Sequence, residues 1–309
     1  GPIAGVLPTN TVAPALTGST GLGAVLSSST GTWSGYPASF TYERKMTRNG
    51  ADIPGATGAT YTITAADSGA ALGVLVRATN AQGPSDWVAS NTITAQTFTV
   101  PSNTVAPVAS GSNGLGSVLS VTNGTWTGNP GSFTYERKWV RGVTDIPGAT
   151  GATYTITAAD SGAGVTPMVR ATNAIGTSGW VAGNTTTVQT FTAPSISGVP
   201  TVSGVAEVGE VLTATPASVT GNPSPTRTWV WLRDDVAIGG ATLSTYTLVG
   251  ADADTLIAPR QVETNAIGTD QATATAVGPI VSAVPANALS MDDLILTMDD
   301  EVLSMETAT

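Results

Sequence analysis

Apolar and polar residues alternate over many short stretches of this chain, and turn-forming residues separate the stretches. The segment Tyr61-Thr62-Ile63-Thr64 is one example, and Tyr154-Thr155-Ile156-Thr157 repeats it. Alternation with a period of two places apolar side chains on one face of a β-strand. The amphipathic helical period is not evident, so the pattern predicts a nearly all-β protein of short strands.

A long internal repeat organises these strands. The sequence DIPGATGATYTITAADSGA of residues 52–70 recurs unchanged as residues 145–163, a spacing of 93 residues, and a diverged third copy contains Tyr246. Units of this size fit one β-sandwich domain of about 100 residues. We predict a linker at residues 1–7, three modules at residues 8–100, 101–193 and 194–285, and a C-terminal segment at residues 286–309.

Positions that are equivalent in the three copies indicate what the module needs. Met46, Trp139 and Trp231 occupy one strand position, and a bulky residue that faces the opposite sheet is the simplest interpretation. The next conserved feature is a turn that begins with Asp67 or Asp160, where the aspartate is expected to cap the turn and the glycine two residues later to adopt a positive φ.

The third copy departs from this pattern at two positions. Gln261 stands where the first two copies have Val76 and Val169, so we expect the third copy to be packed differently, as we do the first copy with Met46. Val219 stands where the second copy has Trp126, so this aromatic is dispensable to the fold.

The order of short motifs carries a family resemblance. Each of the first two copies contains Gly-Thr-Trp, Ile-Pro-Gly-Ala-Thr, Thr-Tyr-Thr-Ile-Thr-Ala-Ala-Asp and Ala-Thr-Asn-Ala in that order. This set resembles the bacterial immunoglobulin-like modules that occur in tandem in tailed-phage virion proteins and bacterial surface proteins. The resemblance covers about residues 8–285. It implies three tandem immunoglobulin-like β-sandwich domains in which Trp139 and Trp231 are the core aromatics of the third strand, with Met46 as a departure.

The composition excludes several kinds of cross-link, catalytic site and metal centre. The chain has no cysteine and no histidine, which excludes disulfides, Ser-His-Asp and Cys-His catalytic arrangements and His-ligated metal centres. Most acids in the first two copies are duplicated, so they are expected to serve the fold of each module and not one catalytic cleft. We predict that the protein is not an enzyme and has no cofactor.

Calcium is a minor alternative to this view. Asp67 and Asp160, or Asp252 and Asp254, could supply oxygen ligands together with nearby carbonyl groups. Neither an EF-hand spacing nor a nonapeptide repeat supports this alternative, so turn capping remains the default interpretation.

Net charge bears on the partners. The formal charge is −10, which makes nucleic acid an unfavourable partner. No run of eighteen apolar residues is present, so no membrane span is expected.

Aromatic residues in turn-rich segments are candidates for a binding surface. Exposed rings there would form a surface for stacking sugars or docking proteins. The alternative, which we favour, is that they close the end of each sandwich. The candidates are Trp33, Tyr36, Trp87, Trp126 and Trp180. The mixed-sign segments Glu43-Arg44-Lys45 and Glu136-Arg137-Lys138 are interpreted as a solvated sheet face.

The C-terminal segment has its own pattern. A Leu-x-Met unit recurs every seven residues and is followed by acids, which favours short strands over a coiled-coil seam. So small a β segment needs a partner for stability, and we predict that it anchors or oligomerises the chain; a disordered acidic tail is the alternative. The predicted anchor residues are Leu289, Met291, Leu296, Met298, Leu303 and Met305.

These inferences together favour a non-enzymatic virion component of a tailed phage, a fibre or decoration protein on the particle surface. Expected partners are capsid or tail proteins, or a second copy through the C-terminal segment, and a glycan or protein of the host surface. The rival hypothesis is a segment of a bacterial cell-surface or extracellular adhesin.

Overall fold

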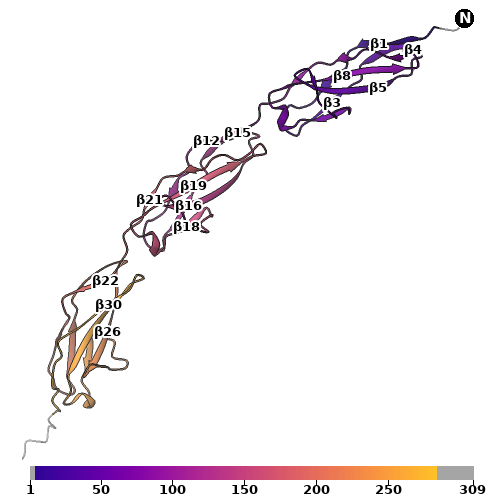
Figure 1. The fold of residues 1–309 in the computed structure, drawn as a ribbon. Helices are drawn as coiled ribbons and strands as arrows, with labels where there is room; N and C mark the ends of the chain where they lie inside the picture. The colour runs from indigo at the N-terminus through magenta and orange to yellow at the C-terminus, as the bar shows by residue number, and fades with distance from the viewer. Residues whose placement is uncertain (1–3, 284–309) are drawn as a thin grey trace, which may run out of the picture. The chain divides into compact units, whose positions relative to one another are not determined.

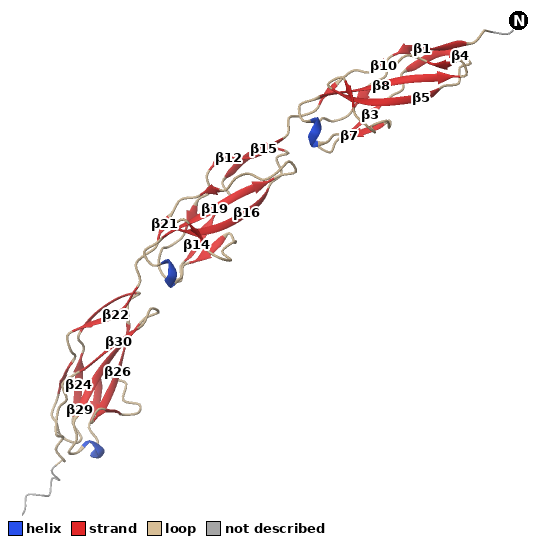
Figure 2. Ribbon diagram, viewed as in Figure 1, coloured by secondary structure: helices blue, strands red, loops and turns tan. Residues whose placement is uncertain are grey.

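The computed structural model describes residues 4–283, and the predicted C-terminal anchor lies outside these residues. The described part consists of short strands, with one short 3-10 helix in each copy (Figure 2). The first copy contains β1 (Val6–Val12), β2 (Leu16–Thr17), β3 (Val25–Ser28), β4 (Thr32–Tyr36), β5 (Thr41–Arg48), β6 (Ala51–Asp52), β7 (Thr60–Thr62), η1 (Ala65–Asp67), β8 (Ala71–Asn80), β9 (Gly83–Pro84), β10 (Val88–Ala89) and β11 (Ile93–Thr94).

The second and third copies repeat this order. The second contains β12 (Thr99–Val105), β13 (Ala109–Ser110), β14 (Val118–Val121), β15 (Thr125–Asn129), β16 (Thr134–Arg141), β17 (Thr144–Asp145), β18 (Thr153–Thr155), η2 (Ala158–Asp160), β19 (Gly164–Thr172), β20 (Val181–Ala182) and β21 (Thr186–Thr187). The third contains β22 (Thr192–Ser197), β23 (Thr201–Ser203), β24 (Val211–Thr215), β25 (Ser218–Asn222), β26 (Thr226–Arg233), β27 (Val236–Ala237), β28 (Thr245–Thr247), η3 (Gly250–Asp252), β29 (Ile257–Thr264) and β30 (Thr269–Thr273).

Each copy forms the same set of antiparallel sheets. In the first copy β1 pairs with β4, β3 pairs with β2 and β7, and the larger sheet has the order β10-β8-β5-β6. The second and third copies repeat this arrangement around the central pairs β16–β19 and β26–β29, with fewer short edge strands in the larger sheet (Figures 1 and 2). The nearly all-β prediction is confirmed.

Strand register repeats along with the sheets. Leu26 lies opposite Tyr61, and the pairs Leu119–Tyr154 and Leu212–Tyr246 occupy the same place in the other copies. The first strand of each copy begins at Val6, Thr99 and Thr192, so the predicted module boundaries at residues 8, 101 and 194 fall inside this strand. The first strand is polar at many positions, so the sequence contains little apolar signal for the residue at which it begins.

The core lies where the alternating pattern places it. Met46, Trp139 and Trp231 are almost completely buried, as predicted for the bulky residue of the central strand. On the paired strand β8, Leu72, Val74, Val76 and Ala78 belong to the same core in the first copy. The residues between them therefore lie on the opposite, outer face of this sheet.

The core of the third copy includes a polar network in place of a valine. Gln261 is fully buried, and its side-chain amide exchanges hydrogen bonds with the backbone N–H and carbonyl of Ala217. The same amide donates to Glu263, a buried residue that pairs with Arg227. The expectation that this copy is packed differently is confirmed.

The chain separates into two compact units by its internal contacts. The first unit contains residues 1–113, 117–155 and 164–187, and the second contains residues 114–116, 156–163 and 188–309. All strands of the first two copies lie in the first unit and all strands of the third copy lie in the second. Three independently folding modules thus stay a prediction.

An asparagine, buried in the first two copies and half-buried in the third, fastens the first strand of each copy to the rest of the module. Asn80, at the end of β8, donates from Nδ2 to the carbonyl groups of Val6 at 2.8 Å and Pro37 at 3.2 Å, and its Oδ1 accepts from the backbone N–H of Gln82. Asn173 and Asn265 make the equivalent bonds in the other copies. The Asn-Ala turn therefore has a structural role beyond the hairpin that the sequence suggested.

We predict that Asn80→Ala destabilises the first copy by about 1–3 kcal/mol, because it removes three part-buried hydrogen bonds that join β1, the segment at Pro37 and the turn after β8. Asn10→Ala is the matched control, since Asn10 also donates to two backbone carbonyls but at an exposed position, and its loss is expected to cost less than about 1 kcal/mol. Hydrogen exchange of peptides that cover β1 is the measurement. Equal protection of β1 in both variants would contradict the prediction.

Candidate functional site

A buried carboxylate in the first copy ties three elements together. Asp67, the last residue of η1, is fully buried and pairs with Arg48 of β5, whose Nε lies 2.7 Å from Oδ1. The Tyr61 hydroxyl of β7 donates to both carboxylate oxygens, at 3.1 and 2.9 Å. The backbone N–H and the hydroxyl of Thr64 donate to Oδ2, which closes the capping box of η1. Since β5 and β7 belong to different sheets, Asp67 links the two sheets.

These contacts decide the ionisation of the three side chains. Burial works to raise the pKa of Asp67, but hydrogen bonds from Thr64, Arg48 and Tyr61 outweigh it, and the net effect lowers the pKa. Burial, reinforced by the neighbouring carboxylate, raises the pKa of the Tyr61 hydroxyl. The hydrogen bond to Asp67 raises the pKa of Arg48 above its ordinary value. The site is thus an ion pair with a neutral tyrosine at neutral pH.

The third copy repeats this link. Asp252 is fully buried, accepts a hydrogen bond from Arg233 Nε at 2.7 Å and contacts the Tyr246 hydroxyl at 3.0 Å. In the second copy Asp160 is fully buried and accepts from the backbone N–H of Thr157 at 2.8 Å.

The predicted turn capping by Asp67 and Asp160 is confirmed, and so is the positive φ of the glycine that follows. In the third copy the residue at this place is Asp254, which has a φ of 62°. The aspartates of the calcium alternative are therefore committed to hydrogen bonds within the fold at three of four positions. Within residues 4–283, no group of three acidic side chains is arranged around a possible metal position.

Two of the five candidate aromatics are buried, which corrects their assignment to an exposed binding surface. Trp33 is 8% exposed and Trp126 is 7% exposed. Each indole N–H donates to a backbone carbonyl at 2.7 Å, that of Thr30 or Asn123. These side chains fill the sandwich, as in the alternative that we favoured. Tyr36, at the end of β4, is exposed.

Trp87 and Trp180 remain partly exposed and are held by cations. Lys45 Nζ lies 4.6 Å from the centroid of the Trp87 ring system, and the Arg77 guanidinium lies 4.8 Å from it. In the second copy, the corresponding cations over Trp180 are Lys138 at 5.1 Å and Arg170 at 4.6 Å. Cation–π contacts of this kind contribute about 0.5–1 kcal/mol each at exposed sites.

Each of these cations also has a carboxylate partner. Lys45 pairs with Asp52 at 2.9 Å and Arg77 pairs with Glu43 at 2.8 Å. Lys138–Asp145 and Arg170–Glu136 repeat the two pairs at 2.8 Å. Two cations and two carboxylates therefore neutralise one another around each tryptophan.

The mixed-sign segment is divided between the two faces of its strand. Glu43 and Lys45 lie on the outer face, as predicted, since they alternate with the buried Met46 and belong to the exposed ion pairs. Arg44 departs from the prediction, because its Nε is buried without a hydrogen-bond partner. A period of two sends the middle residue of the segment to the inner side.

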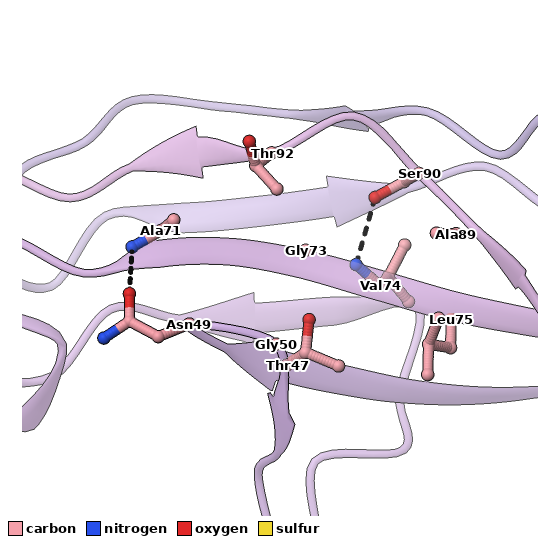
Figure 3. A pocket seen from close by; sticks show the side chains of 10 residues that line it. All are labelled: Thr47, Asn49, Gly50, Ala71, Gly73, Val74, Leu75, Ala89, Ser90 and Thr92. Carbon is pink, nitrogen blue, oxygen red and sulfur yellow. Dashed lines mark hydrogen bonds between the residues drawn. The ribbon is translucent and has the colours of Figure 1, made fainter.

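A small hollow lies on the same outer face of the first copy. It has a volume of about 230 Å³ and its wall carries no ionisable side chain. Figure 3 shows that Thr47, Ser90 and Thr92 surround the bare backbone of Gly73. The Ser90 hydroxyl accepts from the N–H of Val74 at 3.0 Å, and Asn49 Oδ1 accepts from the N–H of Ala71 at 2.9 Å. The complete lining is Thr47, Asn49, Gly50, Ala71, Gly73, Val74, Leu75, Ala89, Ser90 and Thr92.

Trp87 and the charged segment around Lys45 could be identified in the sequence, but their contact with each other could not. The cation–π contacts and the hollow were missed, because their residues are spread over β5, β8 and the segment around β10. One usable signal was present. Residues at the position of Gly73 differ between the copies, with Thr166 in the second.

Comparison with known proteins concerns the fold. No family model and no curated protein sequence matches this chain. Among solved structures, titin domains A168–A170 cover 90% of this chain and 100% of their own, with 15% identity and a TM-score of 0.30. Three domains of the outer capsid protein Hoc of bacteriophage RB49 cover 89% and 100%, with 13% identity and a TM-score of 0.30. A Ca²⁺-stabilised ice-binding adhesin of an Antarctic bacterium covers 89% and 74%, with 17% identity and a TM-score of 0.41.

The strands and sheets of residues 4–283 form tandem β-sandwich modules of the immunoglobulin-like type. Likeness at these identities carries no information about ligands or partners. Residues 4–283 contain no helix with the length and apolar character needed to cross a membrane.

We predict that Asp67→Asn lowers the free energy of unfolding of the first copy by about 1.5–3 kcal/mol at pH 7, because it removes the charge of a fully buried carboxylate that accepts hydrogen bonds from Arg48, Tyr61 and Thr64. The folded-state pKa of Asp67 is lowered, so its contribution is complete above the ordinary aspartate pKa of about 4 and is lost as the pH falls through the lowered value. The difference between wild type and variant is therefore expected to shrink below about pH 4.

Denaturant unfolding at pH 7, 5 and 3 is the measurement for this prediction. Asp52→Asn is the matched control, since Asp52 belongs to an exposed pair whose loss costs less than about 1 kcal/mol. Equal destabilisation by the two substitutions, or a difference independent of pH, would show that Asp67 does not tie the sheets electrostatically.

Proposed function

We propose that this chain is a non-enzymatic structural and adhesive component of a tailed-phage virion, a fibre or decoration protein that displays immunoglobulin-like modules on the particle surface. Its partners would be capsid or tail proteins, or a second copy bound through residues 286–309, together with a glycan or protein of the host surface. A segment of a bacterial cell-surface or extracellular adhesin is the alternative assignment.

One observation supports the non-enzymatic part of this proposal above others. The buried aspartates of the described chain, which are its strongest candidates for acid–base chemistry, are engaged in tying down turns and sheets, as Asp67 is with Arg48 and Tyr61. The exposed acids Glu43 and Asp52 pair with cations on a sheet face. Glycoside hydrolysis needs two carboxyl groups that face one substrate, with one held protonated, and the ion-paired acids do not offer that arrangement.

The repeated architecture supports a display role. Duplicating a module preserves its fold while each copy can change its outer face independently, and this arrangement suits a protein whose task is to present surfaces. The net charge of −10 also disfavours nucleic acid as the partner.

Localisation tests the proposal directly. Particles and cell envelopes purified from the source are analysed by mass spectrometry, and particles are labelled with an antibody against residues 8–285. We expect the protein in the particle fraction and label on intact particles. Recovery in the envelope fraction alone would favour the adhesin alternative and would overturn the virion assignment.

The C-terminal segment provides a second prediction. If residues 286–309 anchor the chain, Leu296→Ser with Met298→Ser, or a chain that ends at Pro285, is expected to lose particle attachment or oligomerisation, because burial of each Leu or Met side chain contributes about 1.5–3 kcal/mol. The thermal unfolding of the three modules is expected to stay unchanged. Sedimentation and particle-binding assays are the measurement, and normal assembly of the truncated chain would place the anchor elsewhere.

A further inference from the structure

The outer face of sheet β10-β8-β5-β6 in the first copy combines two features that the strand register places side by side. Leu75 of β8 lies opposite Lys45 of β5 on one side and opposite Ala89 of β10 on the other. Leu75 and Ala89 line the hollow, whereas Lys45 lies over the ring of Trp87. The tryptophan and the hollow are therefore neighbours on one continuous surface.

We propose that this face is a binding site for a neutral glycan, in which one sugar ring stacks on Trp87 and an adjoining ring enters the hollow. This inference deepens the proposed adhesive function and rests on it. Lys45 and Arg77 lie over the ring of Trp87, which stays partly exposed. The exposed part of the ring can contact an apolar ring face of a sugar.

The size and polarity of the hollow fit this ligand. Pockets for drug-sized molecules measure about 300–1,000 Å³, so a hollow of about 230 Å³ suits a single ring of a longer chain. The hydroxyl groups of Thr47 and Thr92 and the carboxamide of Asn49 can donate and accept hydrogen bonds. Such groups match sugar hydroxyls without bringing a charge.

Charge favours a neutral glycan over an acidic one. Trp87 and the cations Lys45 and Arg77 over it form a platform for stacking. Both cations are already paired, with Asp52 and Glu43, so the platform offers no free positive group. The hollow has no ionisable side chain, and the net charge of the chain is −10. An anionic polymer would be repelled by this protein at long range and would gain no compensating ion pair at the site.

The second copy keeps the ring but has a larger residue at the position of Gly73. Trp180 with Lys138 and Arg170 reproduces the cation-held ring. At the place of Gly73 stands Thr166, whose hydroxyl is hydrogen-bonded to that of Thr185 at 2.7 Å. The second copy is therefore a natural control that has the stacking ring with a threonine in place of Gly73.

The third copy lacks the platform. Glu43 and Arg77 lie opposite each other in the first copy, and the equivalent pair in the third is Thr228 and Val262. Val230 stands in place of Lys45. Only the first of the three copies thus combines both features of the proposed site within the described residues.

Affinity electrophoresis tests the proposal with the full chain. The protein, which is acidic and migrates to the anode, is run in native gels that contain dextran, yeast mannan, arabinogalactan or a soluble mixed-linkage β-glucan, with alginate as the anionic comparison. We expect at least one neutral polymer to retard the chain and alginate to leave its mobility unchanged. Retardation by alginate alone, or by no polymer, would overturn the proposal.

Three substitutions locate the site. Gly73→Thr introduces the residue of the second copy and is expected to weaken retardation about tenfold or more, and Trp87→Ala is expected to abolish it. Trp180→Ala removes the matching ring from the second copy, where Thr166 replaces Gly73, and is expected to change the affinity less than about twofold. Unchanged binding by Gly73→Thr and Trp87→Ala, or equal losses for Trp87→Ala and Trp180→Ala, would overturn the assignment to the first copy.

Folding of the variants is controlled separately. A Cβ at Gly73 would lie 3.1 Å from Thr47 Oγ1, so the Thr47 side chain must shift slightly, and thermal unfolding of the variant shows whether the module tolerates this change. Thr92→Val keeps the volume of the lining and removes only a hydroxyl group, and it is expected to weaken binding several-fold with unchanged unfolding. A chain that is found on particles but binds none of the polymers would overturn this inference and leave the proposed function standing.

Discussion

A carboxylate buried between two sheets is the interaction on which the first and third modules of this protein depend. A module of about 93 residues without cysteine cannot fasten its sandwich with a disulfide. Asp67 instead receives hydrogen bonds from Arg48 in one sheet, from Tyr61 in the other and from the turn that contains Thr64. A charge in this position is stable only when its partners are all in place, so the link also selects one register of the two sheets.

The three copies differ in the parts that do not carry this link. Asp252, Arg233 and Tyr246 preserve it in the third copy, although the core beside them has exchanged a valine for Gln261. The outer sheet face has changed further, from a charged row around Trp87 to the apolar side chains of Val230 and Val262. The buried link constrains the first and third copies in the same way, whereas the outer sheet face differs between the copies.

This division between inside and outside is the physical basis of the functional proposals. The buried carboxylates of Asp67 and Asp252 are used for internal ties, and the acids around Trp87 and Trp180 belong to neutral ion-pair clusters on the surface. An aromatic ring held by cations and a hollow lined by hydroxyl groups remain available to a partner, and both are suited to ligand recognition. A chain of such modules can present several different outer faces on one kind of scaffold.

The sequence by itself determined the elements that depend on local pattern. Period-two alternation identified the strands, the exact duplication identified the copies, and both together located the buried position of Met46, Trp139 and Trp231. Turn chemistry correctly identified the capping aspartates and the glycines of positive φ. These features could be predicted because each is specified by residues that are close in sequence.

Only the tertiary structure decided which aromatic rings are exposed and which groups meet. Trp33 and Trp87 both lie in turn-rich segments, yet the first is buried and the second lies over two cations. Arg48 is 19 residues from Asp67 and lies in another element, and the hollow at Gly73 is formed by residues from 47 to 92. Alternation shows which face of a strand a side chain occupies, but the group that lies opposite it is set by how the sheets pair and pack.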